Sequence, residues 1–174
     1  MKYIFVPISI VGCGKSTVFR TLTGISSRFA HIENDYFSSK RAFYDELQKL
    51  VDGEVPYILV DRNNHLKMHR QQLIELFKKD AVCFVALLFL PANMNKKVFD
   101  TNWKKIVKRG DNHPQLKSTT SVGQVKMVLS LFIKNLDPYN PREKFDAQFD
   151  HVLDMRFGSE SSRENVDKIL DFVY

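Results

Sequence analysis

Short apolar runs alternate with amphipathic segments along this 174-residue chain. The apolar runs are rich in β-branched and aromatic side chains, which predicts strands. Between them, apolar residues recur at every third or fourth position, which predicts helices. We expect strands at 3–8, 29–32, 57–60, 82–90 and 150–155, and helices at 15–22, 38–51, 66–79, 96–107, 122–134 and 163–173.

The predicted strands are apolar at consecutive positions rather than at alternate ones. This pattern is typical of a parallel sheet that is covered by helices on both faces. We therefore expect an α/β fold of three layers with a central parallel sheet. Ligands of such sheets bind beyond the carboxyl ends of the strands. That rule gathers the segments at 9–16, 33–37, 61–65, 91–95 and 135–145 into one site.

The composition is that of an ordinary globular domain, with 44% hydrophobic and 26% charged residues. The length fits one domain over residues 1–174. The longest apolar run, 81–91, is too short for a membrane span of roughly 20 residues and is better explained as a buried strand. The N-terminus lacks a signal-peptide pattern, and Cys13 and Cys83 form no disulfide framework. We expect an intracellular protein, in cytoplasm or nucleus, that is neither secreted nor membrane-bound.

The net charge is +6 and the isoelectric point is about 9.3. A basic balance of this size favours a polyanionic partner. A lysine-rich, solvated surface explains the charge nearly as well.

The first predicted strand is followed by Gly12-Cys13-Gly14-Lys15-Ser16-Thr17. Glycines let a backbone turn sharply and approach an anion with successive N–H groups, and a lysine in this place reaches the β- and γ-phosphates. The Ser16 hydroxyl is placed to bind Mg²⁺. The full pattern G-x-x-x-x-G-K-[ST] lacks its first glycine, which is Ser9 here. The loop predicts a nucleoside triphosphate site, and the alternative is a chance glycine-rich turn.

Carboxylates follow the second and third predicted strands. Asp35 is a candidate general base for an attacking hydroxyl; alternatively it caps the next helix or contacts Mg²⁺ through water. Asp61 closes a hydrophobic strand, the usual setting of a metal-binding carboxylate, and begins the polar run Asp61-Arg62-Asn63-Asn64-His65. This run indicates recognition of phosphate or ribose, and a helix-capping cluster is the alternative.

Further candidates are an arginine and two histidines. Arg109 lies at the start of a polar loop and is a candidate lid arginine that would stabilise a transferring phosphoryl group. A solvated loop arginine fits the sequence too. His113 is expected to be an ordinary loop histidine, with contact to the nucleotide as the alternative, and His31 a buried histidine with a satisfied hydrogen bond. The histidines and cysteines lack the spacing of a zinc site.

Four blocks of the sequence resemble the kinase domain of fungal tRNA ligase. They are I-S-I-V-G-C-G-K-S-T at 8–17, H-I-E-N-D at 31–35, D-R-N-N-H at 61–65 and R-G-D-N-H at 109–113. The resemblance continues at F-I-K (132–134) and F-D-H (149–151), and so covers nearly the whole chain. A small residue at the Ser9 position looks like a trait of that family.

The resemblance implies a P-loop kinase-like fold, with about five strands and a helical lid at about 96–120. It implies an RNA 5′-hydroxyl kinase of tRNA splicing that takes phosphate from GTP with Mg²⁺. By position, Asp35 would be the base, Lys15 and Arg109 would act on the phosphates, and Ser16 and Asp61 would lie at the metal. Arg62, Asn63 and His65 would contact RNA, and Asn140 and Arg142 would contact the guanine.

That family joins a ligase domain, this kinase and a phosphodiesterase in one long chain. The present sequence has neither a ligase-type lysine motif nor a pair of H-x-T motifs, so we expect a domain excised from such a protein, or a free-standing relative. Two other functions fit the phosphate loop: a P-loop kinase of nucleosides or small metabolites, and a non-catalytic nucleotide-binding switch.

Overall fold

A computed structural model describes residues 1–91, 93–109, 116–117 and 119–174 of the chain. Its centre is a sheet of five parallel strands in the order β2-β3-β1-β4-β5. The strands are β1 (Lys2–Ser9), β2 (Phe29–Glu33), β3 (Tyr57–Asp61), β4 (Val82–Phe89) and β5 (His151–Asp154). The predicted α/β fold with a five-stranded parallel sheet is confirmed.

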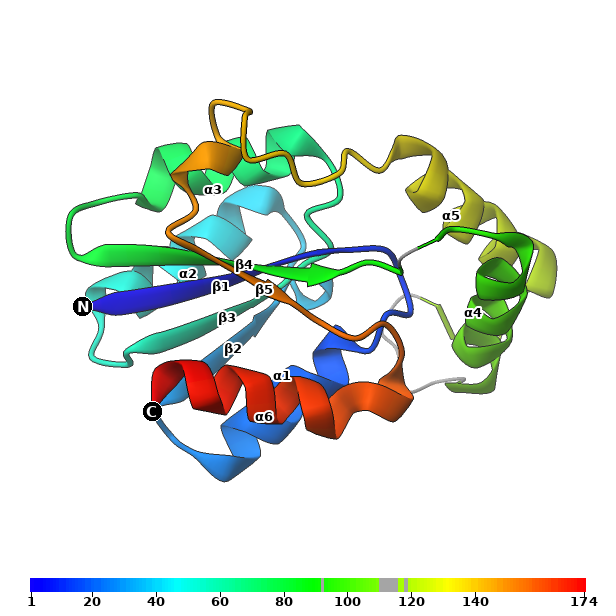
Figure 1. Cartoon of the computed structure of the whole chain (residues 1–174), viewed down its shortest axis with the longest axis horizontal. Helices are drawn as coiled ribbons and strands as arrows, with labels where there is room; N and C mark the ends of the chain where they lie inside the picture. Colours follow the sequence, from blue (N-terminus) through cyan, green and yellow to red (C-terminus); the bar gives the residue numbers. More distant parts are fainter. Residues whose placement is uncertain (92, 110–115, 118) are drawn as a thin grey trace.

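The helices form the outer layers and an end cap (Figure 1). One face of the sheet carries α1 (Lys15–Ile25) and α6 (Ser162–Val173), and the other carries α2 (Lys40–Asp52) and α3 (Lys67–Phe77). The helices α4 (Lys96–Arg109) and α5 (Val122–Asn135) pack together beyond the carboxyl ends of the strands. Short 3₁₀ turns are η1 (Asn34–Tyr36), η3 (Asp146–Gln148) and η4 (Ser159–Ser161). Residues 110–115 and 118 of the predicted lid, His113 among them, lie outside the described residues.

Burial follows the pleat of β1. Ile4, Val6 and Ile8 face the α2 and α3 side, whereas Phe5 faces α1 and α6. Both faces of the central strands are therefore covered, which is why their sequences are continuously apolar. The edge strand β5 differs from that expectation: Val152 is 39% exposed, because one side of an edge strand has no neighbour.

Helix boundaries follow capping side chains. The predicted helix at 38–51 begins at Lys40, since the Ser39 hydroxyl accepts a hydrogen bond from the backbone N–H of Ala42. At the start of α5, Ser121 and Gln124 form a reciprocal capping box. Asp35 lies in the 3₁₀ turn η1, which directly follows β2, whereas the sequence pattern indicates only the end of a strand there.

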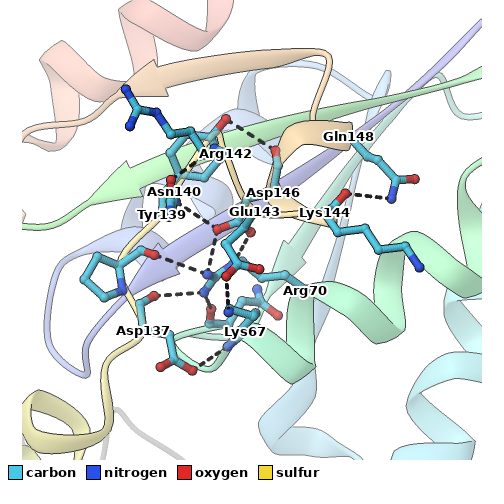
Figure 2. A network of polar contacts seen from close by, with 12 residues as sticks. Lys67, Arg70, Asp137, Tyr139, Asn140, Arg142, Glu143, Lys144, Asp146 and Gln148 are labelled. Carbon is cyan, nitrogen blue, oxygen red and sulfur yellow. Dashed lines mark hydrogen bonds and ion pairs between the residues drawn. The ribbon is translucent and has the colours of Figure 1, made fainter.

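A buried ion pair fastens the segment after α5 to α3 (Figure 2). Arg70 and Asp146 are both fully buried, with Nε to Oδ1 at 2.7 Å and Nη2 to Oδ2 at 2.9 Å. The Arg70 guanidinium also donates from Nη1 to the carbonyls of Asn64 and Asp137, each at 3.1 Å. The network therefore holds three segments together, including the one that follows β3.

Candidate active site

The phosphate loop lies between β1 and α1, as the sequence predicts. Gly12 and Gly14 have φ values of 80° and 96°, which side chains with a Cβ rarely adopt. A Cβ on Gly12 would lie 2.8 Å from Oδ1 of Asn102 and 2.9 Å from Cγ1 of Ile106. Asn102 also donates to the carbonyl of Val11 at 2.7 Å. Helix α4 is therefore seated directly on the loop, and glycine is needed for the approach as well as for the turn.

Ser9, in place of the first glycine of the phosphate-loop pattern, is fully buried. Its hydroxyl donates to Oδ1 of Asn63 at 2.9 Å, and its backbone N–H donates to the Asn63 carbonyl at 2.9 Å. The serine thus ties the beginning of the loop to the segment after β3. A glycine at this position would lack the hydroxyl that bonds to Asn63.

Lys15, the first residue of α1, is paired with a carboxylate below the loop. Its Nζ lies 3.2 Å from Oδ1 of Asp61, while Nε2 of His31 donates to Oδ2 of Asp61 at 2.8 Å. Burial alone would raise the pKa of Asp61, but Lys15 and the hydrogen bonds from His31 and Ser16 hold it well below its usual range. Burial also disfavours the Lys15 ammonium, and Asp61 outweighs this and raises the pKa of Lys15. Both groups are charged at neutral pH.

Asp35 and Arg109 approach the loop from η1 and from the end of α4. Burial raises the pKa of Asp35 above its ordinary value, against the opposing charge of Lys15. Burial lowers the pKa of Arg109, and the Asp35 carboxylate counteracts this effect. Among the described residues, Nε and Nη2 of Arg109 are buried without a hydrogen-bond partner. An unpaired buried guanidinium edge is suited to an anion.

A cavity of about 390 Å³ brings most of the predicted residues together. The predicted residues that line it are Gly12, Cys13, Gly14, Lys15, Ser16, Thr17, Asp35, Asn63 and Arg109. Asp61 lies beneath the loop, where it meets Lys15 and Ser16. A volume of this size is ordinary for a ligand site.

Arg62 and His65 are set back from the cavity. Arg62 donates from Nη1 to the Tyr44 hydroxyl at 3.0 Å. The His65 ring packs on Phe132 of α5, with ring centroids 4.4 Å apart. Burial and the neighbouring charge of Arg62 lower the pKa of His65, so its ring is neutral at pH 7.

Asn140 and Arg142 do not line this cavity. Both are exposed on the segment that the Arg70–Asp146 pair fixes against α3, where the Asn140 N–H donates to Asp146 (Figure 2). The pair therefore holds this segment against α3, and the expected contact of Asn140 and Arg142 with the guanine stays a prediction. The segment after β5 touches the loop instead: the Gly158 N–H donates to the Cys13 carbonyl at 3.0 Å.

The sequence interpretation underestimated two features of the site. His31 has the satisfied hydrogen bond that was expected, but its partner is Asp61, which makes it part of the site. The signal was the alternation in H-I-E-N-D, since His31 and Glu33 lie on the same face of the sheet as Asp61, which pairs in register with Glu33. Arg20, one turn beyond the loop, lines the cavity and pairs with Glu33 at 2.8 Å.

Oxygen donors suited to a hard cation are present at the site. The Ser16 hydroxyl is close enough to Asp61 to help lower the pKa of that carboxylate, so a hydroxyl and a carboxylate already converge at the loop. His31, Glu33 and Asp61 also bring possible ligand atoms within 4.8 Å of one another. The residues present therefore fit Mg²⁺, with Ser16 and Asp61 on the phosphate side.

The fold and the site together define a P-loop kinase: a parallel sheet in this order, a lysine-bearing phosphate loop, carboxylates after β2 and β3, and an arginine on an end helix. A family model described as the tRNA ligase kinase domain matches residues 4–158. The chain belongs to this family. In the described part of the chain, no helix has both the length and the hydropathy of a membrane span.

Relatives agree with this assignment. The chain is 35% identical to a tRNA ligase of Candida albicans, with 98% of this chain aligned, and 30% identical to tRNA ligase 1 of Schizosaccharomyces pombe, with 87% aligned. It spans only 23% and 20% of the lengths of those two proteins.

Solved structures agree as well. A crystal structure of a fungal RNA kinase superposes with a TM-score of 0.82 at 34% identity, covering 99% of this chain and 85% of that one. Kti12 of Chaetomium thermophilum, solved with ADP-AlF3, shares the fold with a TM-score of 0.56 at 15% identity and full coverage of both chains. The predicted family and enzyme class, a polynucleotide kinase, are confirmed. The roles of individual residues and the identity of the donor stay predictions.

Proposed function

We propose that this chain transfers the γ-phosphate of GTP to the 5′-hydroxyl end of RNA, as a step in the joining of tRNA exons. The observation that carries the proposal is one cavity in which the phosphate loop, Asp35 and Arg109 meet, in a member of the tRNA ligase kinase family. Phosphoryl transfer needs little covalent chemistry from the protein. It needs a held donor, a positioned hydroxyl and compensated charge, and these residues supply all three.

The phosphates of the donor would replace Asp61 as the ion-pair partner of the Lys15 ammonium. Its ammonium is paired with Asp61 at 3.2 Å, and a triphosphate on the loop offers the stronger anion. Ser16 and Asp61 would hold Mg²⁺, which when bound neutralises charge on the β- and γ-phosphate oxygens. Backbone N–H groups at the start of α1 add the positive end of the helix dipole.

Asp35 is the proposed general base. The RNA 5′-oxygen forms a bond to the γ-phosphorus, its proton passes to the Asp35 carboxylate, and the bond from phosphorus to the GDP oxygen breaks. A pKa raised above the ordinary aspartate value by burial makes this carboxylate a better proton acceptor. Arg109 supplies donors to the negative charge on the phosphoryl oxygens. Asn63 on the cavity wall and Arg62 behind it are the proposed RNA contacts, and His65, whose ring packs on Phe132, is proposed to support the RNA site from behind.

The test is transfer of label from γ-labelled GTP or ATP to RNA that carries a 5′-hydroxyl. Asp35→Asn should lower kcat by about 10²- to 10⁴-fold and leave GTP affinity near that of the wild type. Asp45→Asn is the matched control, since Asp45 is exposed on α2, where it pairs with Arg41 at 3.8 Å. Survival of transfer in Asp35→Asn within a few-fold would exclude Asp35 as the base.

The donor and acceptor have separate outcomes. Equal labelling from GTP and ATP would leave the kinase in place and remove the GTP preference. No label on RNA, with label on a nucleoside or small metabolite, would support the small-molecule kinase instead. Nucleotide binding with no transfer to any acceptor would support the non-catalytic switch.

The relatives support a proposal about the cellular setting. We propose that residues 1–174 act as the kinase domain beside ligase and phosphodiesterase domains of one parent protein, since each tRNA ligase matched here is several times longer. An intracellular location, in cytoplasm or nucleus, accords with a tRNA substrate. Asn140 and Arg142 are proposed as guanine contacts on the segment after α5, outside the cavity that would hold the phosphates.

A further inference from the structure

The cavity has apolar lining residues that phosphoryl transfer does not require. Besides the phosphate loop, Asp35 and Arg109, it is lined by Ile106, Leu116, Val128 and Phe132. Val128 and Phe132 are one helical turn apart on α5 and therefore share a face. An apolar wall next to a phosphate site is suited to a flat, weakly polar part of a ligand.

Phe132 is held in place from behind. The His65 ring packs against it with ring centroids 4.4 Å apart, and His69 packs against His65 at 5.5 Å. The end of α5 is joined to the same segment, since the Asp137 N–H donates to the His65 carbonyl at 2.8 Å. The phenyl ring is half-buried: one side lies on His65, and the ring also borders the cavity.

The position of Phe132 relative to the sheet indicates which substrate it meets. The strand order places β2 and β3 on one side of β1, and β4 and β5 on the other. Asp35 follows β2, and His65, the partner of Phe132, follows β3. A hydroxyl that is to reach Asp35 enters on this side of the site, together with the nucleoside that carries it.

We propose that Phe132 is the platform on which the terminal nucleobase of the RNA acceptor stacks, an inference that rests on the RNA kinase function proposed above. Every nucleobase has a π-face, and a phenyl ring offers no hydrogen bond that would select one base. The platform therefore orients the end of any RNA toward Asp35 without reading its sequence. It also gives the F-I-K block of residues 132–134 a function that the phosphate chemistry leaves unassigned.

The experiment compares two RNAs of the same sequence that differ at the 5′-terminal nucleoside. One has its nucleobase, and the other has an abasic ribose with the same 5′-hydroxyl. With the intact RNA, Phe132→Leu should lower kcat/KM by about 5- to 150-fold, the equivalent of about 1–3 kcal/mol for a base stacked on an aromatic ring. Phe132→Trp, which keeps an aromatic face, should retain most of the wild-type value. With the abasic RNA, Phe132→Leu and wild type should agree within about twofold.

Leu131→Ala is the control on the same helix, since Leu131 is 49% exposed and does not line the cavity. Equal losses of kcat/KM on both RNAs would overturn the platform, and so would a loss that appears in the KM for GTP instead of RNA. Wild-type protein that labels neither RNA removes the proposed function and this inference with it. If the wild-type protein labels RNA but Phe132→Leu loses the same factor in kcat/KM on both RNAs, only the role of Phe132 as a platform is refuted.

Discussion

Gly12→Ala tests whether α4 is seated on the phosphate loop as closely as the structure has it. The new methyl group would lie 2.8 Å from Oδ1 of Asn102 and 2.9 Å from Cγ1 of Ile106, and the backbone would keep a φ of 80°. A left-handed conformation costs a residue with a Cβ about 1–2 kcal/mol, and overpacking a tight site costs about 1–3 kcal/mol. Together these terms predict a loss of about 2–5 kcal/mol, or about 4–20 °C in Tm for a chain of this size.

The substitution should also affect activity, because α4 ends at Arg109. Relief of the clash moves α4 away from the loop and Arg109 with it. A displacement of about 1 Å in a positioned group can cost about 100-fold in rate. We therefore expect kcat/KM for RNA phosphorylation to fall by about that factor. Thermal unfolding and transfer of γ-label to RNA measure the two effects on the same preparation.

Gly24→Ala is the matched control for this substitution. Gly24 lies in α1, and a Cβ there would have no neighbouring atom within 4 Å. Replacing a helical glycine by alanine should stabilise the protein by about 0.5–1 kcal/mol and leave activity unchanged. The reasoning is refuted if Gly12→Ala unfolds within about 2 °C of wild type and transfers phosphate at the wild-type rate.

Three other predictions follow from buried groups. Arg70→Met should destabilise the protein by about 3–5 kcal/mol in urea unfolding, because it leaves the Asp146 carboxylate buried and unpaired; a loss below about 1 kcal/mol would show that the pair is not buried in solution. Burial is the main cause that lowers the pKa of His69 from 6.5 to about 3. Between these pH values only the unfolded chain binds a proton at this histidine, so the free energy of unfolding should fall as the pH drops from 6.5 to about 3. The fall in Tm should be shallower in His69→Gln, and an equal slope would contradict the assignment. Arg109→Ala should lower kcat by about 10²- to 10³-fold with little change in Tm, since Nε and Nη2 have no hydrogen-bond partner among the described residues; a large drop in Tm would instead mark a structural arginine.

The elements of the sheet could be predicted because their signals are local. The strands are short apolar runs, and the phosphate loop has an ordered set of glycine, lysine and hydroxyl residues. Asp35 and Asp61 could be assigned to the site because parallel strands bring their carboxyl ends to one edge. The predicted helix limits differ by a residue or two where a capping side chain, such as Ser39, decides them.

Long-range contacts could not be predicted in the same way. From the sequence, the segment with Asn140 and Arg142 was expected beyond the carboxyl ends of the strands, beside the phosphate loop. Its location depends on Arg70, an arginine 76 residues before Asp146, and nothing local marks that pairing. The contact of His65 with Phe132 likewise joins residues on separate elements. A local sequence pattern cannot predict such contacts, because the number of residues between two positions does not determine their distance in the fold.

The sequence by itself determined the fold class, the phosphate loop and the two carboxylates, because apolar periodicity and a short motif depend on neighbouring residues only. The tertiary structure alone decided that Lys15 pairs with Asp61, that His31 supports this carboxylate, and that α4 rests on Gly12. It also decided that Phe132, rather than the segment at Asn140, borders the cavity. The physical reason is burial: which groups lose water together, and which partners then compensate them, is set by packing between elements far apart in the chain.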